Sequence, residues 1–266
     1  MSTTLRAPVP VELRSVTGRD RDLFDRIAER YAAKDLRPAS RLARRTRLEQ
    51  TLRVVPQLDR PAIVELGCGA GFAADYLVGS YDTYLGIDHS ASLIELARSL
   101  NSFSGARFEV ADVHDLSADA SADVVLMIGV LHHLEDPRGA MAAAVGLLRP
   151  GGWLVVNEPQ ASNPLIGLAR RARKTVDGDY SSDQREMTPA ELSGLLSGAG
   201  LRETRIAAQG LLSTPFAEVV MRPEWAARPA AALACRLDRS LERLLGRALR
   251  PFAWNVVAAG QRPAER

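Results

Sequence analysis

Apolar residues in the middle of the chain follow two different periods. Short runs in which most residues are apolar predict strands at residues 61–66, 83–88, 106–112, 122–130 and 153–158. Between them, apolar side chains recur every three or four positions, which predicts helices at residues 70–80, 90–100 and 137–148. This alternation predicts an α/β fold with a doubly wound parallel sheet, whose ligands bind beyond the carboxyl ends of the strands.

The segments on either side are predicted to complete this core. Residues 1–60 have a helical pattern, amphipathic at 24–33, and are expected to form an N-terminal helical cap. Residues 61–158 make up the core itself, and the polar, irregular residues 159–187 are expected to form a lid or linker. The last segment, residues 188–266, is predicted to add a helix, two strands and a helical insertion, at 188–201, 202–208, 252–260 and about 212–251.

Within that insertion, residues 231–250 combine two stripes on one predicted helix. The apolar stripe consists of Leu237, Leu241, Leu244, Leu245 and Ala248. The basic stripe consists of Arg236, Arg239, Arg243, Arg247 and Arg250. One interpretation is a solvated helix face. The other is a basic amphipathic helix that rests on an anionic membrane, which implies a lipid or isoprenoid substrate.

Composition and charge narrow the class of protein. The 266 residues are 46% hydrophobic and 25% charged, as in ordinary globular proteins. Two isolated cysteines form neither a disulfide framework nor a metal site, and we find no apolar leader or membrane-length run, so a cytoplasmic location is expected. Residues 61–165 contain 4 basic and 13 acidic residues, which argues against a nucleic-acid partner and suits a positively charged cofactor.

A glycine-rich loop joins the first predicted strand to the first helix, with glycine at positions 67, 69 and 71. Such loops let a nucleotide approach the backbone closely. The dinucleotide fingerprint is G-x-G-x-x-G, whereas the third glycine comes one residue early here. Asp88, at the end of the second strand, suits a ribose under either interpretation. Glu65 before the loop and Asp112 at the end of the third strand favour a different nucleotide from a dinucleotide.

Five motifs now occur in register: VELGCGAG, LGIDHS, ADVHDL, VLHHLEDP and LLRPGGWLVV. Their order and spacing over residues 60–207 resemble the class I S-adenosylmethionine-dependent methyltransferases. The resemblance implies a Rossmann-like sheet of seven strands in the order 3-2-1-4-5-7-6, with strand 7 antiparallel. It also implies S-adenosylmethionine as cofactor and S-adenosylhomocysteine as product.

Carried over by position, the resemblance implies that Glu65 lies near the amino group of the cofactor, that Asp88 holds the ribose hydroxyls and that Asp112 binds the adenine amino group. The remaining implied cofactor contacts are Gly67, Cys68, Gly69, Gly71, His89, Val113, Ile128 and Gly129. Plainer roles stay open for two of these positions. Asp112 could cap the next helix, and Cys68 could simply fill space.

Methyl transfer requires alignment of the acceptor with the methyl group more than a fixed catalytic motif, because the methyl group on a sulfonium is already activated. His132 and His133 follow the fourth strand and are candidate bases, since histidine titrates near neutral pH, although one of them is expected to pack structurally. Glu158 is a further catalytic candidate. The candidate substrate contacts are Asn157, Tyr31 of the cap, and Tyr180 and Met187 near the lid. No metal site is predicted.

We therefore predict a methyltransferase that acts on an oxygen, nitrogen or carbon atom of a small molecule, as in secondary metabolism. The alternatives are a membrane-associated lipid methyltransferase, an NAD-type oxidoreductase and a non-catalytic module that binds S-adenosylmethionine. Nucleic-acid base methyltransferases carry a Pro-Pro-aromatic motif after the fourth strand, where this chain has GVLHHLEDP. Methylation of nucleic-acid bases is therefore disfavoured.

Overall fold

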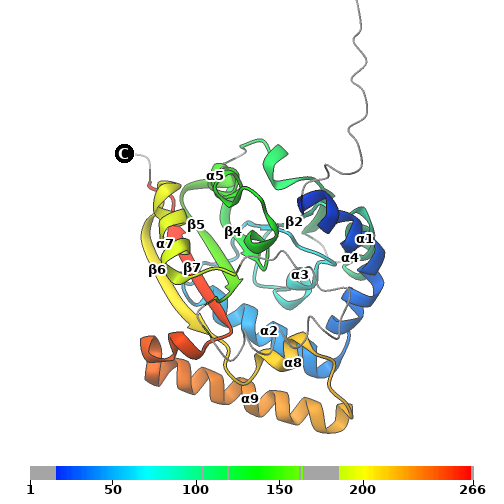
Figure 1. Ribbon diagram of the computed structural model, residues 1–266. Coiled ribbons are helices and arrows are strands. Elements are labelled where there is room, and N and C mark those ends of the chain that lie inside the picture. The colour runs from blue at the N-terminus through cyan, green and yellow to red at the C-terminus, as the bar shows by residue number, and fades with distance from the viewer. Residues whose placement is uncertain (1–15, 103–104, 119, 162, 164–185, 265–266) are drawn as a thin grey trace, which may run out of the picture.

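The computed structural model describes residues 16–102, 105–118, 120–161, 163 and 186–264. Its strands form a seven-stranded sheet of order β3-β2-β1-β4-β5-β7-β6, which confirms the predicted fold class (Figure 1). The strands are β1 (Ile63–Leu66), β2 (Tyr84–Asp88), β3 (Ala106–Val110), β4 (Ala122–Ile128), β5 (Leu148–Pro159), β6 (Arg202–Gln209) and β7 (Asn255–Gln261).

The first five strands run parallel, and β7 runs antiparallel to both β5 and β6, as predicted. In the register of β1, Glu65 lies opposite Gly86 of β2 and Leu126 of β4. The carboxyl ends of the parallel strands consequently meet at one edge of the sheet. The loops that leave this edge carry most of the predicted site residues.

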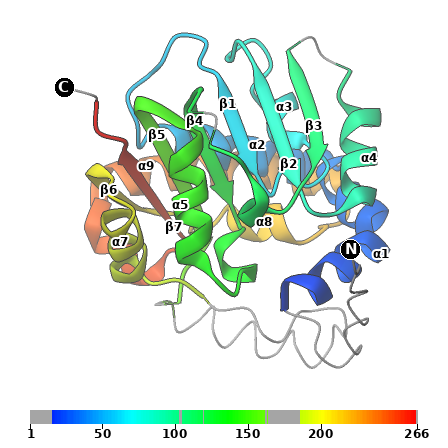
Figure 2. The same cartoon turned by 90° about the horizontal axis from the view of Figure 1, so that it is seen from above.

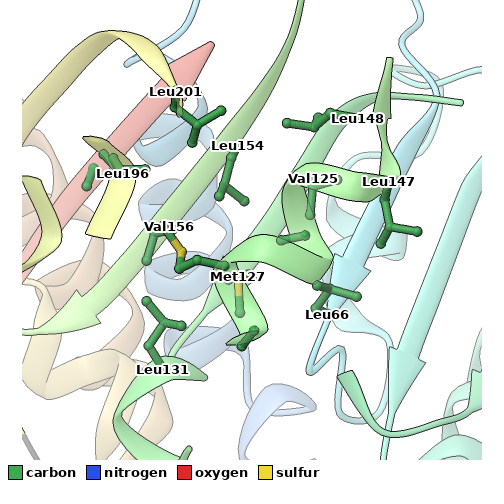
Figure 3. Close-up of a cluster of buried hydrophobic side chains, with 14 of the residues drawn as sticks. Leu66, Val125, Met127, Leu131, Leu147, Leu148, Leu154, Val156, Leu196 and Leu201 are labelled. Atoms are coloured by element: carbon green, nitrogen blue, oxygen red, sulfur yellow. The ribbon is translucent and has the colours of Figure 1, made fainter. Parts of the chain in front are cut away.

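Helices cover both faces of the sheet (Figure 2). On one face, α5 (Pro137–Leu147) and α7 (Pro189–Gly198) bury the cluster of leucine, valine and methionine side chains that Figure 3 shows. On the other face, α2 (Pro38–Leu52), α3 (Phe72–Tyr76) and α4 (Ala91–Leu100) pack on the sheet. Because both faces are covered, β4 is apolar along nearly its whole length.

Two helix starts follow their sequence signals. Ser90 caps α4, since its Oγ accepts the N–H of Leu93 at 3.2 Å. Thr188 opens α7 with a capping box, in which Thr188 and Glu191 each bind the backbone N–H of the other. The prediction for residues 70–80 was too long, because α3 begins only after Gly71 and ends at Tyr76, where the chain turns toward Gly79.

The N-terminal segment forms α1 (Val16–Asp35) and α2, as the cap prediction requires. These helices are joined to the core by a buried polar network around Asp35. Arg44 of α2 donates to Asp35 at 2.8 Å, and the Tyr76 hydroxyl of α3 donates to its other oxygen at 2.8 Å. The predicted division of the chain at residues 60, 158 and 187 stays a prediction.

The insertion between β6 and β7 contains α8 (Thr214–Glu218), α9 (Glu224–Leu245) and η4 (Gly246–Phe252). The predicted helix 231–250 is therefore wrong at both ends, because α9 starts earlier and stops at Gly246. Small residues of α9 make its contacts with α2 and α8, namely Ala227, Ala231 and Cys235. The predicted leucine stripe lies largely outside this contact: Leu237, Leu244 and Leu245 are 42%, 80% and 48% exposed.

Candidate functional site

The glycine loop after β1 has a backbone that other residues cannot easily adopt. Gly67 has φ +73°, and a Cβ there would lie 2.4 Å from Cγ2 of Val130. Gly71 has φ +74°, and a Cβ there would lie 2.6 Å from Cε1 of Phe108. Around Gly69, by contrast, a Cβ would meet only Tyr31, at 3.8 Å. The loop is therefore packed at its two ends and open in its middle, on the side of α1.

The carboxylate of Asp88, at the end of β2, is tied to this loop. Its Oδ2 accepts the N–H of Gly69 at 2.8 Å, and its Oδ1 accepts the N–H of Ser90 at 2.9 Å. Asp88 is only 8% exposed. Each carboxylate oxygen can accept more than one hydrogen bond, so the group keeps capacity for hydroxyl donors.

Glu65 places a second buried carboxyl group beside the loop. It is 4% exposed, and its Oε2 accepts the hydroxyl of Tyr84. Burial raises the pKa of Glu65 from 4.5 to about 7, against the opposing effect of the Tyr84 hydrogen bond and with a contribution from Asp88. Within the described part of the chain, no basic side chain pairs with Glu65. A cation bound nearby would compensate this group.

Helix α1 lies over the same loop. One hydrophobic cluster joins α1 to the loop and to α4. It contains Phe24, Ala28, Tyr31 and Ala32 of α1, Ala70 of the loop and Leu93 of α4. The ring of Phe24 meets those of Tyr31 and His133 edge-on, with both centroid distances 5.5 Å. Asp25 binds the start of α4, accepting the Ser90 hydroxyl at 2.5 Å and the N–H of Ser92 at 3.2 Å. The cap thus encloses the loop from one side.

The other predicted cofactor positions lie along the same edge. His89 follows Asp88, with its ring 6.4 Å from that of Phe24. Asp112 caps η2 (Val113–Asp115) through the N–H of His114 at 3.0 Å, as the capping interpretation holds, and also lies 3.5 Å from Arg21 of α1. Ile128 packs against the core cluster, while Gly129 donates its N–H to the Asn157 carbonyl at 2.8 Å. Cys68 is buried in that cluster too, and burial raises the pKa of its thiol.

A buried carboxylate positions His132 at the end of β4. Glu158 of β5 is 0% exposed, and its Oε1 accepts the N–H groups of Val130 and Leu131 at 2.9 and 2.8 Å. Its Oε2 lies 2.6 Å from Nδ1 of His132. The ring of His132 also contacts that of His133, with a distance of 4.0 Å between the ring centroids. Two of the three residues predicted as catalytic, His132 and Glu158, therefore form one hydrogen-bonded pair, and the role of His133 stays a prediction.

The predicted substrate contacts are distributed differently. Asn157 is 2% exposed, and its Nδ2 donates to Thr51 Oγ1 and to Gln209 Oε1, both at 2.7 Å. It thereby joins β5 to α2 and β6, and its contact with a substrate stays a prediction. Tyr180 lies outside the described residues. Met187 is 2% exposed and packs in the hydrophobic core, and its contact with a substrate stays a prediction.

Comparison with known proteins bears on these assignments. The methyltransferase domain family matches residues 64–156. A ubiquinone biosynthesis O-methyltransferase from Xanthomonas euvesicatoria is 30% identical over 163 residues, which cover 58% of this chain and 67% of that relative. This chain belongs to the class I S-adenosylmethionine-dependent methyltransferases. It is therefore an enzyme whose cofactor is S-adenosylmethionine.

Two further comparisons show how much of the chain of this S-adenosylmethionine-dependent methyltransferase resembles other proteins. An uncharacterized protein from Synechococcus is 37% identical over 106 residues, which cover 37% of this chain and only 25% of that protein. A methyltransferase structure from Thermotoga maritima superposes with a TM-score of 0.64 at 22% identity, covering 91% of this chain and 98% of the other. That structural likeness shows the fold alone.

The residues of this methyltransferase fit the cofactor that its family uses. S-adenosylmethionine carries positive charge on its sulfur and its amino group. Glu65 offers an uncompensated buried carboxyl group, and Asp88 offers lone pairs beside the open middle of the glycine loop. We assign these two side chains and the loop as candidate holders of the cofactor, since a carboxylate in a dry site gains most from a cation.

Sequence reasoning missed the residues that support this site. In the β1–β2 register Gly86 lies opposite Glu65, and Tyr84 lies on the same face of the sheet as Gly86. This placement allows the Tyr84 hydroxyl to donate to Glu65. Phe24 and Asp25 reach the site because α1 packs across α4. The amphipathic pattern at 24–33 indicated that this helix packs on something, but it did not indicate on what.

Proposed function

We propose that this methyltransferase methylates a hydroxyl group of a small molecule, with His132 as general base and Glu158 as its positioning residue. One observation supports this proposal above the others, the 2.6 Å contact between Nδ1 of His132 and the buried carboxylate of Glu158. Two relatives, from Thiobacillus denitrificans and Xanthomonas euvesicatoria, are named O-methyltransferases, which favours an oxygen acceptor.

The contact between His132 and Glu158 gives the two imidazole nitrogens of His132 different roles, which suits a general base. The carboxylate of Glu158 only accepts hydrogen bonds, so Nδ1 of His132 carries the proton and Nε2 is left to accept one. S-adenosylmethionine supplies the methyl group on a positively charged sulfur. As the new carbon–oxygen bond forms and the carbon–sulfur bond breaks, Nε2 takes the hydroxyl proton, and Glu158 stabilises the resulting imidazolium.

A panel of phenols and aliphatic alcohols, incubated with labelled S-adenosylmethionine, tests the proposal. Wild type is expected to label at least one hydroxyl compound, and His132→Gln is expected to lower kcat by roughly a hundredfold. His114→Gln is the matched control, because His114 is exposed on η2 and contributes only its backbone N–H at Asp112. Equal losses in both variants, or label on amines alone, would refute the hydroxyl mechanism.

A second candidate, a lipid-like acceptor presented at a membrane, is favoured by the exposed face of α9. Leu233, Leu237 and Leu244 recur on one side of the helix and are 57%, 42% and 80% exposed, while Trp225 at its start is 80% exposed. Apolar side chains that are exposed side by side can mark a protein or membrane contact. Exposed arginines on the same helix, Arg228, Arg236 and Arg243, suit anionic lipid headgroups. No helix in the described part of the chain is long and apolar enough to cross a membrane.

Vesicle sedimentation tests this second candidate. Wild type is expected to bind vesicles with phosphatidylglycerol, and replacement of the three leucines by serine is expected to abolish binding without loss of thermal stability. Leu36→Ser/Leu100→Ser, which changes exposed leucines on other elements, is expected to bind as wild type does. Failure of wild type to sediment with such vesicles removes the membrane-presented acceptor and leaves the first proposal in place.

A further inference from the structure

A groove with a volume of about 320 Å³ lies between α2, β6 and α9, and no candidate cofactor residue lines it. Its lining contains four arginines: Arg53, which directly follows α2, Arg239 and Arg243 of α9, and Arg250 of η4. Glu242 of α9 is the acidic residue among the lining side chains. We propose that this groove is a second binding site, which holds a multiply charged phosphate anion.

The arginines of the groove are poorly neutralised by the protein. Arg53, Arg239 and Arg243 form no hydrogen bond or ion pair through their guanidinium groups with the part of the chain that the structure describes. Arg250 is held in place, because its Nη2 donates to the carbonyl of Ile206 at 3.0 Å. Gathering like charges in one concave site is unfavourable without an anion, so the arrangement itself indicates a ligand.

The one carboxyl group in the groove offsets this charge only in part. Glu242 is engaged by the protein, since its Oε1 accepts the N–H of Gly210 at 2.8 Å. Burial raises the pKa of Glu242 to about 7, with Asp238 raising it further and Arg47 and the Gly210 hydrogen bond lowering it. Near neutral pH this group is therefore partly protonated, and the groove keeps most of its positive charge.

Phosphate is the anion that best matches the lining. Guanidinium groups form paired hydrogen bonds with phosphate oxygens, and arginine is favoured where that geometry matters. Several arginines lining one groove suit two or more phosphate charges, as in a diphosphate, and a volume of about 320 Å³ has the size of a small-ligand site. These arginines gather at one groove, whereas a nucleic-acid surface would spread its basic residues along a face.

The floor of the groove is connected to the candidate catalytic pair. Gln209 lines the groove and accepts a hydrogen bond from Asn157, at 2.7 Å. Asn157 directly precedes Glu158 on β5. Gln209 is therefore one hydrogen bond and one peptide unit away from Glu158, the residue proposed to position His132.

Calorimetric titration of the full chain with pyrophosphate tests the proposal. Arg239→Gln/Arg243→Gln is expected to weaken binding by at least about tenfold, since two charge-assisted contacts are lost. The matched control, Arg228→Gln/Arg236→Gln, removes the same charge from the same helix outside the groove, and is expected to bind pyrophosphate as wild type does. Glu242→Gln keeps an oxygen for Gly210 and removes the negative charge, so it is expected to bind pyrophosphate more tightly.

The source of the phosphate is distinguished by a second arm with vesicles that contain phosphatidylglycerol. A groove-specific loss of pyrophosphate binding indicates a soluble phosphorylated ligand, and a groove-specific loss of vesicle binding alone indicates a lipid headgroup. Either result supports the site. If the groove variant and its control behave alike in both arms, or if wild type binds neither probe, the proposal is overturned.

Discussion

The buried carboxyl group of Glu65 destabilises the cofactor-free protein but favours binding of a positively charged cofactor. It lies in a dry position with a tyrosine hydroxyl and no basic partner in the described chain, and burial raises its pKa to about 7. A ligand that brings positive charge removes that penalty. Affinity for the cofactor and stability of the free protein should therefore respond in opposite directions when this residue is changed.

Glu65→Gln is expected to separate the two effects. An acid whose pKa is raised on folding contributes stability below pH 4.5, and this contribution is lost as pH rises to about 7. At pH 8 the variant is therefore expected to gain up to about 3 kcal/mol over wild type in urea unfolding, and at pH 4 to gain little. A variant less stable than wild type at pH 8 would contradict the assignment.

The same substitution tests cofactor binding. In wild type, affinity for S-adenosylhomocysteine is expected to weaken as pH falls below about 7, because Glu65 must lose its proton to receive the amino group. Glu65→Gln is expected to bind more weakly at pH 8 and to show little change between pH 6 and 8. Parallel pH profiles for the two proteins would place the cofactor amino group elsewhere.

Glu158→Gln isolates the positioning of His132. The amide oxygen of glutamine can still accept the N–H groups of Val130 and Leu131, but its NH₂ group would face Nδ1 of His132. This change forces the proton onto Nε2, so kcat is expected to fall roughly a hundredfold with little change in the KM for the acceptor. An unchanged kcat, or a loss of activity that a higher cofactor concentration reverses, would show that the contact between His132 and Glu158 has only a structural role.

Which residues could be predicted depended on how locally they act. Asp88 and the glycine loop are readable because a strand end and a turn fix their surroundings within a few positions. The contact between Tyr84 and Glu65 depends on strand register, and that between Phe24 and His133 depends on helix packing. Neither leaves a pattern in the sequence, because each joins segments that are far apart along the chain.

At the scale of elements, α1 is the part of the cap that the site depends on. It is fastened to the start of α4 by Asp25, which accepts hydrogen bonds from Ser90 and Ser92. Although burial acts to raise the pKa of Asp25, those hydrogen bonds lower it overall. The helix therefore lies over the glycine loop through a few polar contacts and one aromatic cluster.

Asp25→Ala is expected to loosen α1 without unfolding the core. Affinity for S-adenosylhomocysteine should fall about fivefold to tenfold, in line with the loss of one or two charge-assisted hydrogen bonds. Trypsin should cut more quickly at the exposed Arg26 and Arg30 of α1. Asp22→Ala, on the preceding turn, controls for a general effect on the helix. Unaltered cleavage and affinity would mean that the aromatic cluster alone holds α1.

Element boundaries show where local pattern stops being informative. The caps of α4 and α7 were predictable, because Ser90 and Thr188 act on backbone groups within three residues. For α9 the prediction followed large apolar residues, whereas the packed face is made of Ala227, Ala231 and Cys235. Small residues carry little hydrophobic signal, yet they allow two helices to approach closely.

At the scale of the molecule, the order of the sheet was the most predictable property. The five parallel strands follow from the alternation of elements, and the antiparallel seventh strand followed only from resemblance to a family. The placement of the insertion followed from neither. Its contact with α2, through residues such as Ala39 and Ala43, creates the arginine groove from segments that lie far apart in the chain.

The central claim is that the glycine loop, Glu65 and Asp88 hold S-adenosylmethionine. Calorimetric titration with S-adenosylhomocysteine tests it most directly, with NAD as the competing nucleotide and Asp88→Ala, checked for folding by circular dichroism, as the site variant. We predict that wild type binds S-adenosylhomocysteine and not NAD, and that folded Asp88→Ala binds it at least about tenfold more weakly. Binding of NAD in its place, or equal affinity in wild type and variant, would contradict this account of the site.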